Sequence, residues 1–206
     1  MSAATVRGPQ DTSPVLTPMA AGEQSAFRVL LDCMARPGKV GGLGPVQPAD
    51  GGWSAALQAM QVVLDHEVTF AVAAESPAVR ETLLRRTGSR TAPLDRADYA
   101  VADADHALKA VNGADEGDLD YPERGATVVI RCARLGKGPV RLRLAGPGIN
   151  GHAHLAVDGL ASDVFRAIAD RNASFPLGID VVLAAEDGDV ACLPRTTRIS
   201  LEEDGE

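Results

Sequence analysis

The stretch ATVVIRCA at 126–133, with VRLRL close behind at 140–144, decides the fold because it carries the clearest β signal in the chain. The first segment is rich in valine and isoleucine, which favour extended backbone, and it predicts a strand. The second alternates apolar residues with arginine, so it predicts a strand with one face in the core and one in water. The intervening Leu135-Gly136-Lys137-Gly138 predicts a turn, and the three segments together predict a β-hairpin with one wet face.

Outward from this hairpin, helices and strands are predicted along the rest of the chain from periodicity and from capping or turn residues. Helices are expected at 24–36, 53–64, 77–88, 103–111 and 162–172, and further strands at 68–72, 98–101, 154–157, 179–184 and 190–193. Helices and strands alternate early in the chain and hairpins dominate later. This order predicts an α/β fold, a three-layer-like sandwich in which helices cover a mixed β-sheet.

Length and composition predict one domain of ordinary size, since 206 residues of which 45% are hydrophobic can bury a core. Residues 1–22 are rich in Ala, Thr, Ser and Pro without hydrophobic period, and are predicted to form a flexible N-terminal arm. The α/β domain is expected at 23–200, followed by an acidic tail at 201–206.

The charge pattern argues against two classes of partner. The formal charge is -8 and the 20 lysines and arginines are scattered, so no basic stripe matches nucleic acid. No apolar run approaches the ~20 residues of a membrane helix, and the N-terminus lacks the layout of a signal peptide, so a cytoplasmic location is expected. The three cysteines, Cys33, Cys132 and Cys192, form no Cys-x-x-Cys pair and are predicted to pack in the core.

Two polar segments are candidate binding sites for an anion. Pro194-Arg195-Thr196-Thr197-Arg198 combines guanidinium and hydroxyl donors suited to phosphate, phosphonate or an acidic surface, and its alternative is a solvated strand or an interface pairing with Asp or Glu. The loop 146–151, GPGING, can expose backbone N–H groups, and its alternative is a tight turn. The candidate ligand or partner-binding residues are therefore Arg195, Thr196, Thr197, Arg198, Gly146, Gly148 and Asn150.

Other polar positions favour structural roles. His152 and His154 are expected on one face of a strand, as surface or packing residues rather than metal ligands, and His66 is expected at a helix end. The loop 172–178, NASFPLG, is a candidate interface as readily as a core plug. No nucleophile elbow or Cys–His pairing is legible, so no catalytic residue and no metal site are predicted.

Six blocks of this sequence together resemble the H subunit family (PhnH) of the bacterial carbon–phosphorus lyase system. They are FRVLLDCMARPG (27–38), LDHEVTF (64–70), GATV (125–128), LAGPGI (144–149), NASFPLGID (172–180) and LPRTTR (193–198). The resemblance implies a homodimer with a fold similar to pyridoxal-phosphate transferases, which joins the G, I and J subunits in a core complex. That complex forms alpha-D-ribose 1-phosphonate 5-triphosphate from ATP and an alkylphosphonate and releases adenine, in phosphonate catabolism. The resemblance supplies no catalytic residue for the H subunit.

A pyridoxal enzyme needs a sheltered lysine for its Schiff base, and the three lysines, Lys39, Lys109 and Lys137, all stand in contexts that favour exposure. We therefore expect no bound pyridoxal phosphate. Two main hypotheses remain: a subunit that is not catalytic by itself, and a small-molecule module that binds a nucleotide or phosphonate. A self-sufficient transferase is disfavoured, because no base, nucleophile or metal set is legible.

Overall fold

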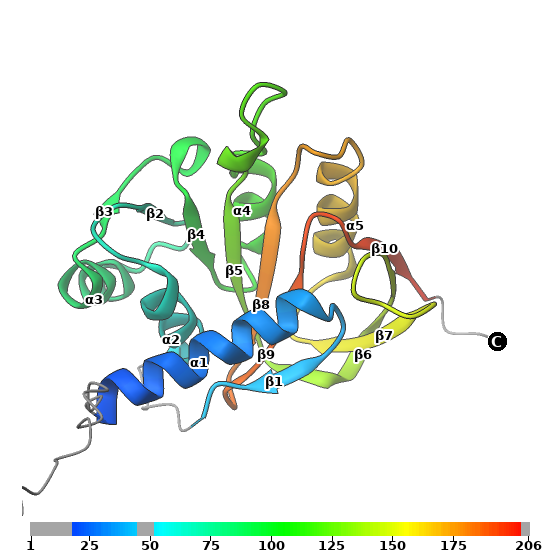
Figure 1. The fold of residues 1–206 in the computed structure, drawn as a ribbon, viewed down its shortest axis with the longest axis horizontal. Helices are drawn as coiled ribbons and strands as arrows, with labels where there is room; N and C mark the ends of the chain where they lie inside the picture. Colours follow the sequence, from blue (N-terminus) through cyan, green and yellow to red (C-terminus); the bar gives the residue numbers. More distant parts are fainter. Residues whose placement is uncertain (1–17, 45–51, 203–206) are drawn as a thin grey trace, which may run out of the picture.

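The computed structural model describes residues 18–44 and 52–202 (Figure 1). Its α-helices are α1 (Pro18–Ala35), α2 (Ser54–Val63), α3 (Pro77–Thr87), α4 (Ala107–Gly113) and α5 (Ser162–Arg171). Its strands are β1 (Val40–Gly42), β2 (Thr69–Val72), β3 (Arg90–Thr91), β4 (Tyr99–Ala102), β5 (Thr127–Cys132), β6 (Arg134–Ala145), β7 (Ala153–Asp158), β8 (Asp180–Ala185), β9 (Asp189–Leu193) and β10 (Arg198–Leu201). The predicted α/β class is confirmed.

The strands form two sheets. The larger has seven strands in the order β1-β9-β8-β5-β4-β2-β3. Its strands β3, β2, β4, β5 and β8 are parallel, β9 is antiparallel to β8, and β1 is antiparallel to β9, so the predicted mixed sheet is confirmed. The smaller sheet is antiparallel, in the order β10-β6-β7.

The large sheet is buried on both faces. Helices α1, α2 and α3 pack on one face, while α4, α5 and the small sheet pack on the other (Figure 1). Along β5, Val128 and Ile130 belong to the second of these cores and Val129 to the first. Burial on both faces explains why β5 carries the continuous apolar run 128–130 rather than an alternating pattern.

The predicted hairpin between residues 126–133 and 140–144 is wrong. Strand β5 lies between β4 and β8 in the large sheet, whereas β6 pairs with β7 and β10 in the small one. Only Ala133 separates β5 from β6, so the chain passes directly from one sheet to the other. The glycines at 136 and 138 lie within β6, where the pairing with β7 shifts between Leu135 and Val140. The true hairpin joins β6 to β7 through the loop 146–152.

Helix α1 begins at Pro18 rather than at Gln24, and it ends at the predicted stop, since Gly38 adopts a φ of 90°. Residues 18–22 of the predicted arm are therefore helical, and its residues 1–17 lie outside the described residues. At the other end, Leu201 of the predicted tail pairs with Leu142, and 203–206 lie outside the described residues.

Most of the other predicted helices and strands agree with the structure. Strands β2, β4, β7, β8 and β9 and helices α2, α3 and α5 lie where they were predicted, within one or two residues. Helix α4 begins four residues late because the Asp103 carboxylate accepts a hydrogen bond from the backbone N–H of His106 in a turn before it. All three cysteines are buried, which confirms their packing role. Across residues 18–44 and 52–202 no helix is long and apolar enough to cross a membrane.

Candidate functional site

Arg195, the first candidate anion ligand, is held by the protein itself. Its Nη2 donates to Asp180 Oδ2 at 2.7 Å and to the Gly125 carbonyl at 2.8 Å, and Nη1 donates to the Pro122 carbonyl at 2.8 Å. Its Nε is 3.2 Å from Asp180 Oδ2, and its backbone N–H donates to Asp180 Oδ1 at 2.8 Å. The guanidinium therefore links the start of β8 to the loop before β5. Its ion pair with Asp180 corresponds to the alternative from the sequence, in which an arginine of this segment pairs with Asp or Glu.

The other polar residues of the segment 194–198 differ in exposure. Thr197 is only 3% exposed, and its Oγ1 has no hydrogen-bond partner among the described residues. Arg198 is exposed at the start of β10, opposite Ala145 of β6. Thr196 is half-buried between them. The segment therefore does not point its four side chains at one ligand.

The glycine loop 146–151 is a tight turn shaped by its neighbours. A Cβ on Gly146, whose φ is 141°, would lie 2.7 Å from the Thr196 carbonyl oxygen. A Cβ on Gly148, whose φ is 81°, would lie 2.1 Å from the Ala35 carbonyl oxygen at the end of α1. Asn150 is exposed at the tip of the loop. The structure thus brings the loop against Thr196, as backbone packing that requires glycine.

A second basic surface lies on the outward face of the small sheet. Leu142 and Leu144 of β6 are buried against the core, so Arg141 and Arg143, which alternate with them along the strand, face outward. In the register of the sheet Arg143 lies opposite His154 of β7 on one side and Ser200 of β10 on the other. We call this outward surface of β10, β6 and β7 the basic face.

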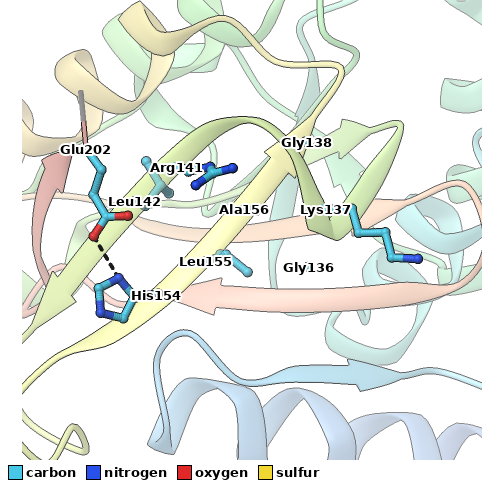
Figure 2. A pocket seen from close by; sticks show the side chains of 9 residues that line it. All are labelled: Gly136, Lys137, Gly138, Arg141, Leu142, His154, Leu155, Ala156 and Glu202. Carbon is cyan, nitrogen blue, oxygen red and sulfur yellow. Dashed lines mark ion pairs between the residues drawn. The ribbon is translucent and has the colours of Figure 1, made fainter. Parts of the chain in front are cut away.

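Two grooves run over the basic face. The larger encloses about 630 Å³ and is shown in Figure 2; it is lined by Gly136, Lys137, Gly138, Arg141, Leu142, His154, Leu155, Ala156 and Glu202. The smaller encloses about 180 Å³ and is lined by Arg143, Ala145, His152, Arg198, Ile199 and Ser200. In the larger groove His154 and Glu202 point toward each other, with Nδ1 2.7 Å from Oε1 (Figure 2). The paired residues Arg143 and His154 lie where the two grooves meet.

Among the exposed large apolar side chains, two pairs lie on α1 and on the loops before β5 and β8. On α1, Phe27 is 44% and Leu31 is 53% exposed, although their neighbour Leu30 is buried. Above the start of β5 and β8, Leu119 is 79% and Phe175 is 65% exposed. The loops that carry these two are joined, because the Gly178 N–H donates to the Glu116 carbonyl at 2.9 Å. The loop 172–178 therefore does not bury its Phe in this chain, and such patches are typical of protein interfaces.

All three lysines are exposed, and two of them lie beside an oxygen acceptor. Lys39 pairs with the Asp32 carboxylate, Lys109 Nζ lies 3.5 Å from the Ala73 carbonyl, and Lys137 is exposed. His106 Nδ1 lies 2.7 Å from Asp103 Oδ1, in the turn before α4. Within residues 18–44 and 52–202 no three His, Cys, Asp or Glu side chains gather in a way that could hold a metal ion.

Two of the three cysteines, Cys132 and Cys192, have a raised thiol pKa. Desolvation raises the pKa of the Cys132 thiol to about 12, with further contributions from Asp187 and Glu186. The pKa of Cys192 is also raised, first by its hydrogen bond with Cys33 and then by burial. These thiols stay protonated near neutral pH, which disfavours nucleophilic roles.

Sequence reasoning missed the basic face, although one signal for it was present. The alternation VRLRL correctly placed Arg141 and Arg143 on a wet face. The strand β10 that brings Arg198 beside them has no apolar run of its own and was not predicted as a strand.

Comparison with known proteins gives a consistent result. The profile of the family described as "Bacterial phosphonate metabolism protein (PhnH)" matches residues 14–200. A Stutzerimonas stutzeri protein, provisionally named C-P lyase subunit protein HtxG, is 39% identical over 180 residues, which cover 87% of each chain. The "Alpha-D-ribose 1-methylphosphonate 5-triphosphate synthase subunit PhnH" of Rhizobium meliloti (strain 1021) is 34% identical over 184 residues, covering 87% of this chain and 90% of the relative.

Proposed function

Because this chain belongs to the PhnH family of bacterial phosphonate metabolism proteins, we propose that it is a subunit of a carbon–phosphorus lyase core complex. In that complex it would be required to form alpha-D-ribose 1-phosphonate 5-triphosphate from ATP and an alkylphosphonate, with release of adenine. The observation that carries this proposal is similarity along almost the whole chain to relatives whose names make them subunits of such an assembly.

The subunit is proposed to be non-catalytic by itself. This is supported by how its polar groups are used: Arg195 is committed to Asp180 and two carbonyls, and the glycine loop is packed against the chain. The raised pKa of Cys132 disfavours it as a nucleophile. Chemistry in the complex would then reside with other subunits.

The proposed partners are a second copy of the chain and the G, I and J subunits, in the cytoplasm. Exposed Phe27 and Leu31 on α1, and Leu119 and Phe175 on the joined loops, offer two separate apolar surfaces for such contacts. Apolar anchors surrounded by polar surface are the usual centres of stable interfaces. Neither surface is assigned to a particular partner.

We propose further that the fold is that of pyridoxal-phosphate transferases without the cofactor site. Support comes from the parallel strands covered on both faces and from the three lysines, of which Lys39 is tied to Asp32 and Lys137 is exposed. Absence of an internal-aldimine absorbance band after incubation with pyridoxal phosphate is the expected result. A band that disappears in one Lys→Ala variant would contradict this part of the proposal.

The subunit proposal is tested by co-purification of the tagged chain from cells that also express the neighbouring phosphonate genes, followed by sizing and mass spectrometry. A stoichiometric assembly containing the G, I and J proteins is expected. The variants F27D,L31D and L119D,F175D should each lose partners or dimer, whereas Leu108→Asp, on the exposed part of α4, should not. Recovery of the wild-type chain alone would contradict the subunit function.

A second candidate function is a small-molecule module for a nucleotide or phosphonate. The observation that favours it is the basic face, where arginine side chains line two grooves.

A further inference from the structure

The basic face concentrates positive charge in a protein whose formal net charge is -8. The residues lining its two grooves include four permanent cations and a single carboxylate, Glu202. The cations are Lys137, Arg141, Arg143 and Arg198. In an acidic chain such a local concentration of positive charge favours the accumulation of an anion.

Strand register sets the arginines in a row. Arg141 and Arg143 are two positions apart on the outward side of β6, which is roughly 7 Å along a strand. Arg198 lies opposite Ala145, the next outward position of β6. The row therefore extends over two such steps, and runs from the larger groove into the smaller one.

Within residues 18–44 and 52–202, these arginines lack the carboxylate partners that several other arginines have. Arg131 pairs with Glu186, Arg171 with Glu116 and Arg195 with Asp180. In the part of the chain that the structure describes, Arg141, Arg143 and Arg198 form no such ion pair. A guanidinium fork without a carboxylate is free to take up phosphate or phosphonate oxygens in its place.

Among the described residues that line the two grooves, the one carboxylate, Glu202, has a partner. Glu202 Oε1 lies 2.7 Å from Nδ1 of His154, and Figure 2 shows the imidazole turned toward Glu202 across the groove. This contact leaves Nε2 of His154 as a further polar group on the groove wall. The carboxylate of Glu202 thus pairs with His154, while its backbone N–H donates to the Arg141 carbonyl at 2.9 Å, so Glu202 is also the sheet neighbour of Arg141.

We propose that the basic face binds a linear polyphosphate chain carried by a small molecule, with Arg141, Arg143 and Arg198 as its ligands. This inference rests on the small-molecule function proposed above and assigns its residues. Three guanidinium groups spread over two strand steps exceed the size of one phosphate group, so a chain of phosphates contacts more of them than a single phosphate does. The grooves are open, so the affinity depends strongly on salt.

The row also differs from the site that sequence alone suggested. Arg195 is not part of it, because Asp180, Pro122 and Gly125 occupy its donors. Arg198 is the one arginine of that segment that faces the groove. Its neighbours on the face come from β6 and β7 instead.

The test is isothermal titration of the full chain with inorganic tripolyphosphate and with ATP, at 50 and 200 mM salt, against inorganic phosphate and methylphosphonate. Tripolyphosphate should bind at least about tenfold more tightly than either monoanionic group, and should weaken at the higher salt. In R141Q,R143Q the binding of tripolyphosphate should fall at least about tenfold. R80Q,R90Q removes two exposed arginines elsewhere and makes the same change in net charge, and it should change binding less than about twofold.

Arg143→Lys provides a second variant that keeps the charge but not the fork, and intermediate binding is expected. Equal losses in R141Q,R143Q and R80Q,R90Q would show only a net-charge effect and overturn the proposal. No heat with tripolyphosphate for the wild-type chain would also overturn it. So would loss of co-purifying subunits from R141Q,R143Q with anion binding unchanged, because the face would then be a docking surface for an acidic protein. Intact co-purification with lost anion binding supports the site, and leaves the subunit function standing.

Discussion

The hydrogen bonds and ion pair that Arg195 makes within the protein lead to a quantitative prediction for Arg195→Ala. The substitution removes donors to Asp180 and to the Pro122 and Gly125 carbonyls, and leaves the Asp180 carboxylate with one described donor, the backbone N–H of residue 195. The side chains of Arg195 and Asp180 are 15% and 25% exposed, so water reaches the vacated groups only in part. Removing one member of such a pair destabilises a protein by about 3 kcal/mol, at the low end of values for buried pairs.

The loss should be measured by urea unfolding and by thermal melting. For a chain of this size, about 3 kcal/mol corresponds to a fall in Tm of roughly 6–12 °C. Arg198→Ala is the matched control, since it removes an arginine three positions away that is exposed and has no ion pair in the described residues; it should change the free energy of unfolding by less than about 0.5 kcal/mol. If the two variants unfold with free energies within about 0.5 kcal/mol of each other, Arg195 has no structural role and its assignment as an anion ligand returns.

Two further predictions concern the glycine loop and a buried thiol. Gly148→Ala should lower the free energy of unfolding, measured in urea, by about 2–4 kcal/mol, because its Cβ would meet the Ala35 carbonyl. Gly136 has a similar φ but open space around it, so Gly136→Ala should lower the free energy of unfolding by only about 1 kcal/mol. Equal losses in the two variants would contradict the packing role of Gly148. The pKa of Cys132 is raised to about 12 from an ordinary 9.0, so the stability that its neutral thiol contributes is present below pH 9.0 and falls as the pH rises toward 12, by about 1.4 kcal/mol per pH unit. Urea unfolding of the wild type and Cys132→Ala from pH 8 to 10.5 should show the steeper decline in the wild type, and parallel declines would refute the assignment.

Local sequence patterns predicted most helices and central strands because each of those elements carries its own burial signal. Helix α2 shows its apolar stripe, and β8 is apolar after its first residue, Asp180, as is typical of a strand buried on both faces. Strands β1, β3 and β10 have only three, two and four residues. They form because their backbones pair with strands elsewhere in the sequence, as Val40 of β1 does with Ala191 of β9. No local pattern contains that information.

The hairpin failed for a related reason. The alternation in β6 correctly showed which residues face water, but it could not show which sheet they belong to. The single residue Ala133 between β5 and β6 was enough for the chain to change sheets. The sequence thus predicted that Arg141 and Arg143 face solvent, but not that they lie in the small sheet.

The candidate site was predicted less well than the fold. The segment 194–198 was correctly singled out as rich in donors, but the acceptors that hold Arg195 lie up to 73 positions away in the sequence. Whether an arginine binds a ligand or its own chain depends on such distant acceptors. The same limit hid the row formed by Arg141, Arg143 and Arg198, which needs the pairing of β6 with β10.

The contacts of α1 and β1 with β9 affect how the chain folds during its synthesis on the ribosome. Cys33 Sγ lies 3.8 Å from the Val190 carbonyl, a contact that spans 157 positions, and β1 pairs only with β9 in the described part of the chain. Helix α1 can therefore contact β9 only after the intervening chain has been synthesised. During that interval the nascent chain exposes Leu30 and Cys33, which makes it a natural client for a chaperone. The α1 side of the large sheet is therefore completed only when β9, far along the chain from α1, is available to pair.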